Sequence, residues 1–144
     1  MLQNKQAELR SKLSWWKSLS GTEFERELVQ HYRRKAFSVE WTGGSGDQGV
    51  DFFLRDKKGR KIIVQAKCHR SYISPSVVRD LFGALMHHGA DEAWLVTTSG
   101  FHRGARSFAD GKPIRLLTIR DILDGKESCD VMVQVEAVES MGSD

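Results

Sequence analysis

The chain has 144 residues, of which 40% are hydrophobic and 28% are charged, and its formal net charge is +3. A chain of this length can bury the core of one domain without disulfides or metals. It contains no apolar run long enough to span a membrane, no hydrophobic signal region at its N-terminus and no C-x-x-C pair. We therefore expect a cytoplasmic protein with reduced thiols and no membrane partner.

The two halves of the chain differ in charge. Residues 1–72 contain 15 Lys/Arg and 8 Asp/Glu, a net +7, whereas residues 73–144 contain 7 and 11, a net −4. The basic residues of the first half are clustered at 33–35, 57–61 and 67–70. A solvated surface is the ordinary explanation of such clusters, but a one-sided positive field is also typical of proteins that bind polyanions.

Two helices are expected before residue 37. In residues 2–19, three leucines and Trp16 fall near helical spacing between basic residues, which predicts an amphipathic helix. The adjacent Trp15 and Trp16 are too many for one stripe, so this helix is a candidate dimer contact, with packing on its own core as the equal alternative. A second helix is expected over residues 22–36, where Thr22 and Glu25 match a capping box.

After residue 36 the hydrophobic period changes to two. Residues 37–41 predict a half-buried strand, the alternation of Val50, Phe52 and Leu54 predicts a second, and residues 61–68 predict a third. Next we expect a helix over residues 75–88 that Gly89 closes, a strand at 93–98 buried on both faces, a short helix at 103–109, a strand at 114–118 and a helical turn at 121–123. Residues 131–135 alternate again and are compatible with an edge strand.

The order of these elements is α-β-β-β-α-β, followed by a short helix and one more strand. This order predicts an α/β fold with a mixed central sheet that is flanked by helices on both faces.

Gly44, Gly46 and Gly49 match the G-x-G-x-x-G pattern of dinucleotide-binding loops. Such a loop needs its glycines between a strand and a helix, because the pyrophosphate lies at the N-terminus of that helix. Here a strand is predicted after the glycines, so they belong to a hairpin loop in which glycine supplies positive φ. Such a loop can place Asp51, and with it Asp47, at the mouth of a site.

The third predicted strand carries two polar side chains on one face. Because side chains alternate along a strand, Ile63, Gln65 and Lys67 share a face. Polar side chains that protect an edge strand are one explanation. The other is a site: if the hairpin register places Asp51 opposite this strand, a carboxylate, an amide oxygen and an ammonium group converge.

Asp51, thirteen residues and then Gln65-Ala66-Lys67 together resemble the D…(D/E/Q)-x-K signature of the PD-(D/E)xK nucleases. The resemblance is closest to the Mrr-like restriction endonuclease branch, in which glutamine replaces the second acid. It covers residues 21–124 and leaves an N-terminal helix at 1–20 and an acidic tail at 125–144. Further matching blocks, in family order, are GTEFE at 21–25, SGD at 45–47, GVD at 49–51, VQAK at 64–67, VRDLFGA at 78–84 and VTTS at 96–99.

The resemblance implies a restriction-endonuclease-like core and a metal-dependent endonuclease that hydrolyses phosphodiester bonds of double-stranded DNA. Asp51 would be the anionic ligand of Mg²⁺, for which Mn²⁺ would substitute, and Gln65 and the backbone carbonyl of Ala66 would be further ligands. Lys67 would stabilise developing charge or orient the attacking hydroxide. Because Gln65 removes a negative charge, the family pattern adds a carboxylate at Glu25, directly or through water. The capping box is the alternative role of Glu25.

Four further residues are candidates for the surroundings of this site. Asp47 is either an outer-shell acid or a turn residue, and His69, Arg70 and Arg79 are either phosphate contacts or solvated surface. A junction-resolvase-like nuclease that selects branched DNA is the first alternative function, and a non-catalytic DNA-binding or assembly module is the second.

Mrr-like enzymes commonly carry a separate DNA-recognition domain, whereas about twenty residues precede the core here. Target selection therefore cannot be transferred from the family; a separate recognition subunit would supply it, or it is missing. One site per chain favours a homodimer, because both strands of a duplex must be cut.

Overall fold

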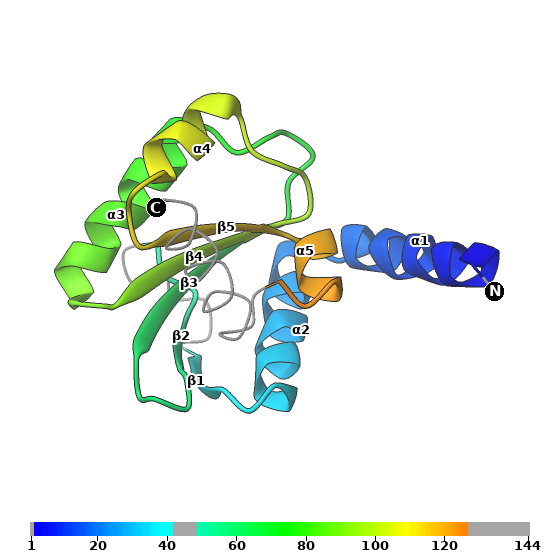
Figure 1. The fold of residues 1–144 in the computed structure, drawn as a ribbon, viewed down its shortest axis with the longest axis horizontal. Helices are drawn as coiled ribbons and strands as arrows, with labels where there is room; N and C mark the ends of the chain where they lie inside the picture. Colours follow the sequence, from blue (N-terminus) through cyan, green and yellow to red (C-terminus); the bar gives the residue numbers. More distant parts are fainter. Residues whose placement is uncertain (1, 42–48, 127–144) are drawn as a thin grey trace, which may run out of the picture.

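The computed structural model describes residues 2–41 and 49–126 (Figure 1). The predicted order of helices and strands is confirmed over these residues. Asp47, most of the glycine loop and the acidic tail with its expected edge strand lie outside them. The elements are α1 (Leu2–Ser18), α2 (Gly21–Arg34), β1 (Ser38–Trp41), β2 (Phe52–Arg55), β3 (Lys61–Lys67), α3 (Pro75–His88), β4 (Glu92–Thr97), α4 (Arg103–Ala109), β5 (Ile114–Thr118) and α5 (Ile119–Leu123).

The sheet has five strands in the order β1-β2-β3-β4-β5. The pairs β1–β2 and β2–β3 are antiparallel, whereas β3–β4 and β4–β5 are parallel, so the predicted mixed sheet is confirmed. β3 is the central strand. The explanation that Gln65 and Lys67 protect an edge strand is therefore wrong.

The two faces of the sheet bury two hydrophobic cores. Figure 1 shows α2 and α5 on one side of the sheet and α3 and α4 on the other, so the prediction of helices on both faces is confirmed. Each large aliphatic or aromatic side chain in these cores contributes about 1.5–3 kcal/mol through removal from water. The first core, under α2 and α5, contains Phe24, Leu28, Tyr32, Phe52, Leu54, Ile62, Val64 and Trp94. The second core, under α3 and α4, contains Val50, Ile63, Val78, Leu81, Leu85, Leu95 and Ala105.

The alternation predicted for the second strand breaks at Asp51. In a regular strand Val50 and Phe52 would share a face, but Val50 packs in the second core and Phe52 in the first. The expectation is therefore right for Phe52 and Leu54 and wrong for Val50. Asp51 lies just outside β2, although its N–H still donates to the carbonyl of Val64 at 2.9 Å. A local irregularity of this kind changes the direction of a side chain.

The capping box of α2 lies two residues earlier than predicted. Ser20 is the N-cap: its hydroxyl accepts from the N–H of Glu23 at 3.2 Å, and its own N–H donates to the Glu23 carboxylate at 2.9 Å. The predicted box of Thr22 and Glu25 is therefore wrong. The helix that starts at Gly21 places its apolar stripe, including Phe24, in the first core, and Glu25 then lies beyond the cap.

α1 extends away from the sheet in Figure 1. Its C-terminal end packs on the first core through Trp16, whose ring meets Phe24 edge-on with centroids 5.9 Å apart. Trp15 is 48% exposed. Core packing is thus confirmed for Trp16, and Trp15 remains at the surface. Among the described residues, no helix has the length and apolarity needed to cross a membrane.

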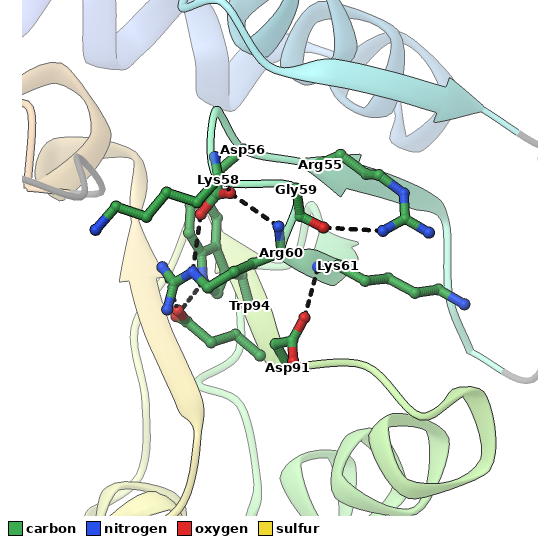
Figure 2. Close-up of polar contacts among 9 residues, drawn as sticks. Arg55, Asp56, Lys58, Gly59, Arg60, Lys61, Asp91 and Trp94 are labelled. Carbon is green, nitrogen blue, oxygen red and sulfur yellow. Dashed lines mark hydrogen bonds and ion pairs between the residues drawn. The ribbon is translucent and has the colours of Figure 1, made fainter.

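A polar network joins the start of β4 to the β2–β3 turn (Figure 2). Glu92 is buried, with 5% of its surface exposed, and its Oε2 forms an ion pair with Nη2 of Arg60 at 3.0 Å. Nε of Arg60 contacts Oδ2 of Asp56 at 2.9 Å, and the Trp94 indole N–H donates to Oε1 of Glu92 at 3.0 Å. A buried carboxylate is costly without such partners. The network therefore fixes the first residues of β3 and β4, at the end of the sheet away from Lys67.

Candidate active site

Asp51 is bonded to β3 through both its main chain and its side chain. Besides the main-chain bond to Val64, its Oδ2 accepts from the N–H of Ala66 at 2.7 Å. The register of β2 on β3 pairs Phe52 with Val64, so Asp51 lies beside Gln65. The expected position of Asp51 against the third strand is confirmed.

The Asp51 carboxyl is half-buried in an electrostatically unfavourable place. Burial raises the pKa of Asp51 to about 6, against the hydrogen bond from the Ala66 N–H, which lowers it. The negative charge of Glu25 raises this pKa further, and the positive charge of Lys67 lowers it. Glu25 and Lys67 therefore both lie close enough to Asp51 to act on its charge, from α2 and from the end of β3.

Glu25 is held by Trp41, a residue that the sequence did not single out as part of the site. The Trp41 indole N–H donates to Oε1 of Glu25 at 2.6 Å, and both side chains are half-buried. This bond ties α2 to the last residue of β1. A half-buried indole N–H usually has an acceptor, which is the signal that could have suggested such a partner.

Gln65 and Lys67 follow the buried part of β3 and are half-buried themselves. Their neighbours Ile62, Val64 and Ala66 contact the first core, so the predicted alternation of β3 is confirmed. A Cβ atom added to Gly49 would lie 3.5 Å from Nε2 of Gln65. The Gln65 amide thus reaches the segment that leads to Asp51.

Gly49 has a φ of +81°, as expected for a glycine of a hairpin loop. The strands on its two sides, β1 and β2, pair antiparallel. The glycines therefore connect two strands of a hairpin, as predicted, and no helix follows them to bind a pyrophosphate.

The donors around Asp51 fit a hard divalent cation. They are oxygen atoms: the carboxylates of Asp51 and Glu25, the amide oxygen of Gln65 and the backbone carbonyl of Ala66. Within residues 2–41 and 49–126, no group of three or more His, Cys, Asp or Glu is placed to hold a metal. The fit thus depends on two carboxylates whose mutual repulsion raises the pKa of Asp51. A cation between them would offset this repulsion.

Comparison with known protein families shows to which family this chain belongs. The model of the Mrr_cat family, described as restriction endonuclease, matches residues 16–124. This chain belongs to the Mrr_cat family. The resemblance seen in the Asp51 and Gln65-Ala66-Lys67 motif is thereby confirmed.

Two curated relatives share part of this Mrr_cat sequence. The type IV methyl-directed restriction enzyme EcoKMrr of Escherichia coli (strain K12) is 33% identical over 100 residues, which are 68% of this chain and 31% of the relative. The mitochondrial protein C824.03c of Schizosaccharomyces pombe (strain 972 / ATCC 24843) is 30% identical over 86 residues, 56% of this chain and 35% of the relative. The chain therefore spans about a third of the length of these relatives.

Two solved structures share the fold of the Mrr_cat chain. The DNA modification-dependent restriction endonuclease AspBHI has a TM-score of 0.64 at 22% identity, over 81% of this chain and 34% of that chain. The MspJI restriction endonuclease, in complex with a 27-mer oligonucleotide, has a TM-score of 0.54 at 22% identity, over 78% of this chain and 28% of that chain. The predicted restriction-endonuclease-like core is confirmed.

Three other predicted residues of this Mrr_cat domain lie at the surface. His69 and Arg70 are exposed in the segment that follows β3, and Arg79 is exposed on α3. The structure thus brings Glu25, Asp51 and the end of β3 together and leaves these three basic residues exposed to solvent.

Proposed function

We propose that residues 21–124 are the catalytic domain of a divalent-metal-dependent DNA endonuclease of the restriction or defence type. The observation that carries this proposal is the half-buried Asp51 carboxylate, which is bonded to β3 at Ala66 and lies within electrostatic reach of Glu25 and Lys67. Membership of the Mrr_cat family and the restriction activity named for the relative EcoKMrr support it. The proposed substrate is double-stranded DNA in the cytoplasm.

In this proposal Asp51 is the anionic ligand of the metal, and Gln65 and the carbonyl of Ala66 complete the protein ligands on β3. Glu25 contributes its charge directly or through a water, with its orientation set by Trp41. Mg²⁺ is the proposed ion and Mn²⁺ its substitute. When bound, such an ion polarises the phosphodiester and lowers the pKa of a coordinated water.

In this proposal Lys67 stabilises the negative charge that develops on the phosphate. Its ammonium lies near Asp51, at the end of the strand that carries Gln65, so its charge would act on a phosphate held by the same ion. A positive charge placed in advance costs little reorganisation when charge develops on the phosphate oxygens. Lys67 therefore stabilises the transition state or orients the attacking water.

The test of this function is cleavage by the purified chain. Linear duplex and four-way-junction DNA are incubated with Mg²⁺, with Mn²⁺ or with EDTA, and the products are separated on denaturing gels. Cleavage of linear duplex with either metal and none in EDTA is the expected result, because charge stabilisation at the phosphate requires the ion. Cleavage confined to the junction would favour a resolvase-like nuclease. No cleavage of either DNA would leave the non-catalytic DNA-binding module.

We propose that the active form is a homodimer, with the exposed Trp15 of α1 in the contact between the chains. Two sites are needed to cut both strands of a duplex. Light scattering should then give a mass near twice the 16.3 kDa of one chain, and a strictly monomeric mass would count against the dimer.

Target selection is assigned to a separate recognition subunit. The exposed His69, Arg70 and Arg79 are assigned to phosphate contacts.

A further inference from the structure

The segment that follows β3 is fixed to the segment that follows β4. Residues 69–73 and 98–102 run side by side, and Ile73 and Phe101 form a parallel β-bridge. The hydrogen bonds between the two segments give residues 69–73 a defined shape. Four hydrogen bonds join the two segments: Thr98 Oγ1 to the His69 carbonyl (3.2 Å), Ser99 Oγ to the Ser71 carbonyl (2.8 Å), Ile73 N–H to the Gly100 carbonyl (2.8 Å) and His102 N–H to the Ile73 carbonyl (3.0 Å).

Tyr72 projects from this fixed segment and is 60% exposed. A Cβ atom added to Gly100 would lie 3.2, 3.3 and 3.5 Å from Cε1, Cζ and Cδ1 of the tyrosine. Because three ring atoms are nearly equidistant from that point, the ring lies with its face over Gly100. The His102 ring meets it at an interplanar angle of 65°, with centroids 5.9 Å apart. One face of the Tyr72 ring is thus covered by backbone, while most of the side chain remains open to solvent.

The segment that contains Tyr72 and the segment paired with it carry positive charge and no Asp or Glu. Residues 67–79 contain Lys67, Arg70 and Arg79, residues 93–109 contain Arg103 and Arg106, and neither stretch contains Asp or Glu. His69, Arg70, His102 and Arg103 are exposed. Such a surface attracts the phosphates of a nucleic acid.

Tyr72 is also close to Lys67 along the chain. Tyr72 lies five positions after Lys67, which corresponds to at most about 18 Å of extended chain between their Cα atoms. At a rise of about 3.4 Å per nucleotide, this distance corresponds to about five nucleotides from a phosphate at Lys67.

We propose that Tyr72 is a stacking platform for one unpaired base of DNA, within about five nucleotides of the scissile phosphate. The inference rests on the proposed function in taking DNA as the ligand. The base must be unpaired and accessible, because a base inside a duplex is already stacked on both faces. The basic side chains around Tyr72 hold the flanking phosphates, and the ring, fixed over Gly100, loses little freedom when the base stacks on it.

The side chain of Tyr72 can be removed without loss of the four bonds that fix its segment, because those bonds use main-chain groups and other side chains. Tyr72→Ala should therefore fold normally, which thermal unfolding checks. Tyr72→Phe keeps the ring. Met86→Ala is the matched control, because it removes a similarly exposed apolar side chain elsewhere. Met86 is 66% exposed and lies near the C-terminal end of α3.

The experiment measures affinity of the full chain by fluorescence anisotropy in EDTA. The probe is a fluorescein-labelled duplex with a short single-stranded gap. Tyr72→Ala should bind this probe about 5- to 100-fold more weakly than wild type, whereas Tyr72→Phe and Met86→Ala should bind with wild-type affinity. On the same duplex with an abasic gap, wild type and Tyr72→Ala should bind equally.

Two results would overturn the stacking role: wild-type affinity of Tyr72→Ala for the intact gap, or an equal loss on the intact and abasic gaps. Cleavage with Mg²⁺ is measured separately. Wild-type cleavage together with normal binding by Tyr72→Ala would reject the platform and leave the proposed function in place. Binding that depends on Tyr72, without metal-dependent cleavage by wild type, would support the platform and reject the nuclease function.

Discussion

Lys67→Ala is expected to reduce metal-dependent DNA cleavage by at least about 100-fold, because in the proposed function it removes the positive charge that stabilises the transition state. Lys67 is half-buried at the end of β3, and its charge acts on Asp51. The loss should appear in the single-turnover rate with DNA bound to saturating enzyme. DNA affinity should change little, since one of many basic residues is lost.

The matched control for this variant is Lys61→Ala. Lys61 begins the same strand and, by alternation, lies on the same face as Lys67, but its ammonium donates to the carbonyl of His88 at 3.2 Å. Lys61→Ala should cleave DNA at the wild-type rate. If Lys67→Ala cleaves as fast as this control, Lys67 has no catalytic role.

Asp51→Asn is expected to abolish metal binding and, at the same time, to stabilise the metal-free protein. The folded state raises the pKa of Asp51 from 3.8 to about 6, so folding opposes ionisation of this group at neutral pH. Asparagine has no charge to bury and can still accept from the N–H of Ala66. We expect the free energy of unfolding to rise by about 1–2 kcal/mol at pH 8, after allowance for solvent screening.

The pH dependence gives this prediction a direction. Because the folded pKa of Asp51 lies above the unfolded value, the stability associated with its protonated form is fully present below about pH 4. This stability is lost as the pH rises through about 6. Urea unfolding of wild type and Asp51→Asn should therefore give similar stabilities near pH 4 and the full difference above pH 7. A variant that is less stable than wild type at pH 8 would contradict this account.

Asp56→Asn is a control for which the opposite change in stability is expected. Burial acts to raise the pKa of Asp56, but hydrogen bonds from the Arg60 side chain and from the N–H groups of Arg60 and Lys58 lower it overall. The ionised form of Asp56 therefore stabilises the fold above its unfolded pKa, and this stability is lost as the pH falls. Asp56→Asn should destabilise the protein at pH 8 and leave calorimetric Mg²⁺ binding unchanged, whereas Asp51→Asn should show no binding.

Much of the fold follows from local patterns in the sequence. The change of hydrophobic period after residue 36 marked the start of the sheet, and the uniformly apolar stretch before Thr97 indicated a strand buried on both faces, as β4 is. The alternation along β3 also predicted that Gln65 and Lys67 lie on the same face of the sheet. These features depend on side-chain spacing within one element, which the sequence contains directly.

The features that the sequence did not reveal depend on contacts between elements. Ser20-x-x-Glu23 and Thr22-x-x-Glu25 both match a capping box, and tertiary packing of α2 decides between them. The contact of Trp41 with Glu25 joins residues sixteen positions apart. The central place of β3 follows from the parallel pairing with β4, which lies beyond a whole helix in the sequence.

The break in alternation at Asp51 has a consequence for how this domain tolerates change. Val50 is inserted in the core under α3 and α4, and Phe52, two residues later, in the core under α2 and α5. The carboxylate between them is thus anchored on both sides of the sheet, independently of whatever chain precedes Gly49. Insertions and deletions before Gly49 would therefore leave Asp51 in place, so the segment before Gly49 is free to diversify while the proposed metal ligand is kept.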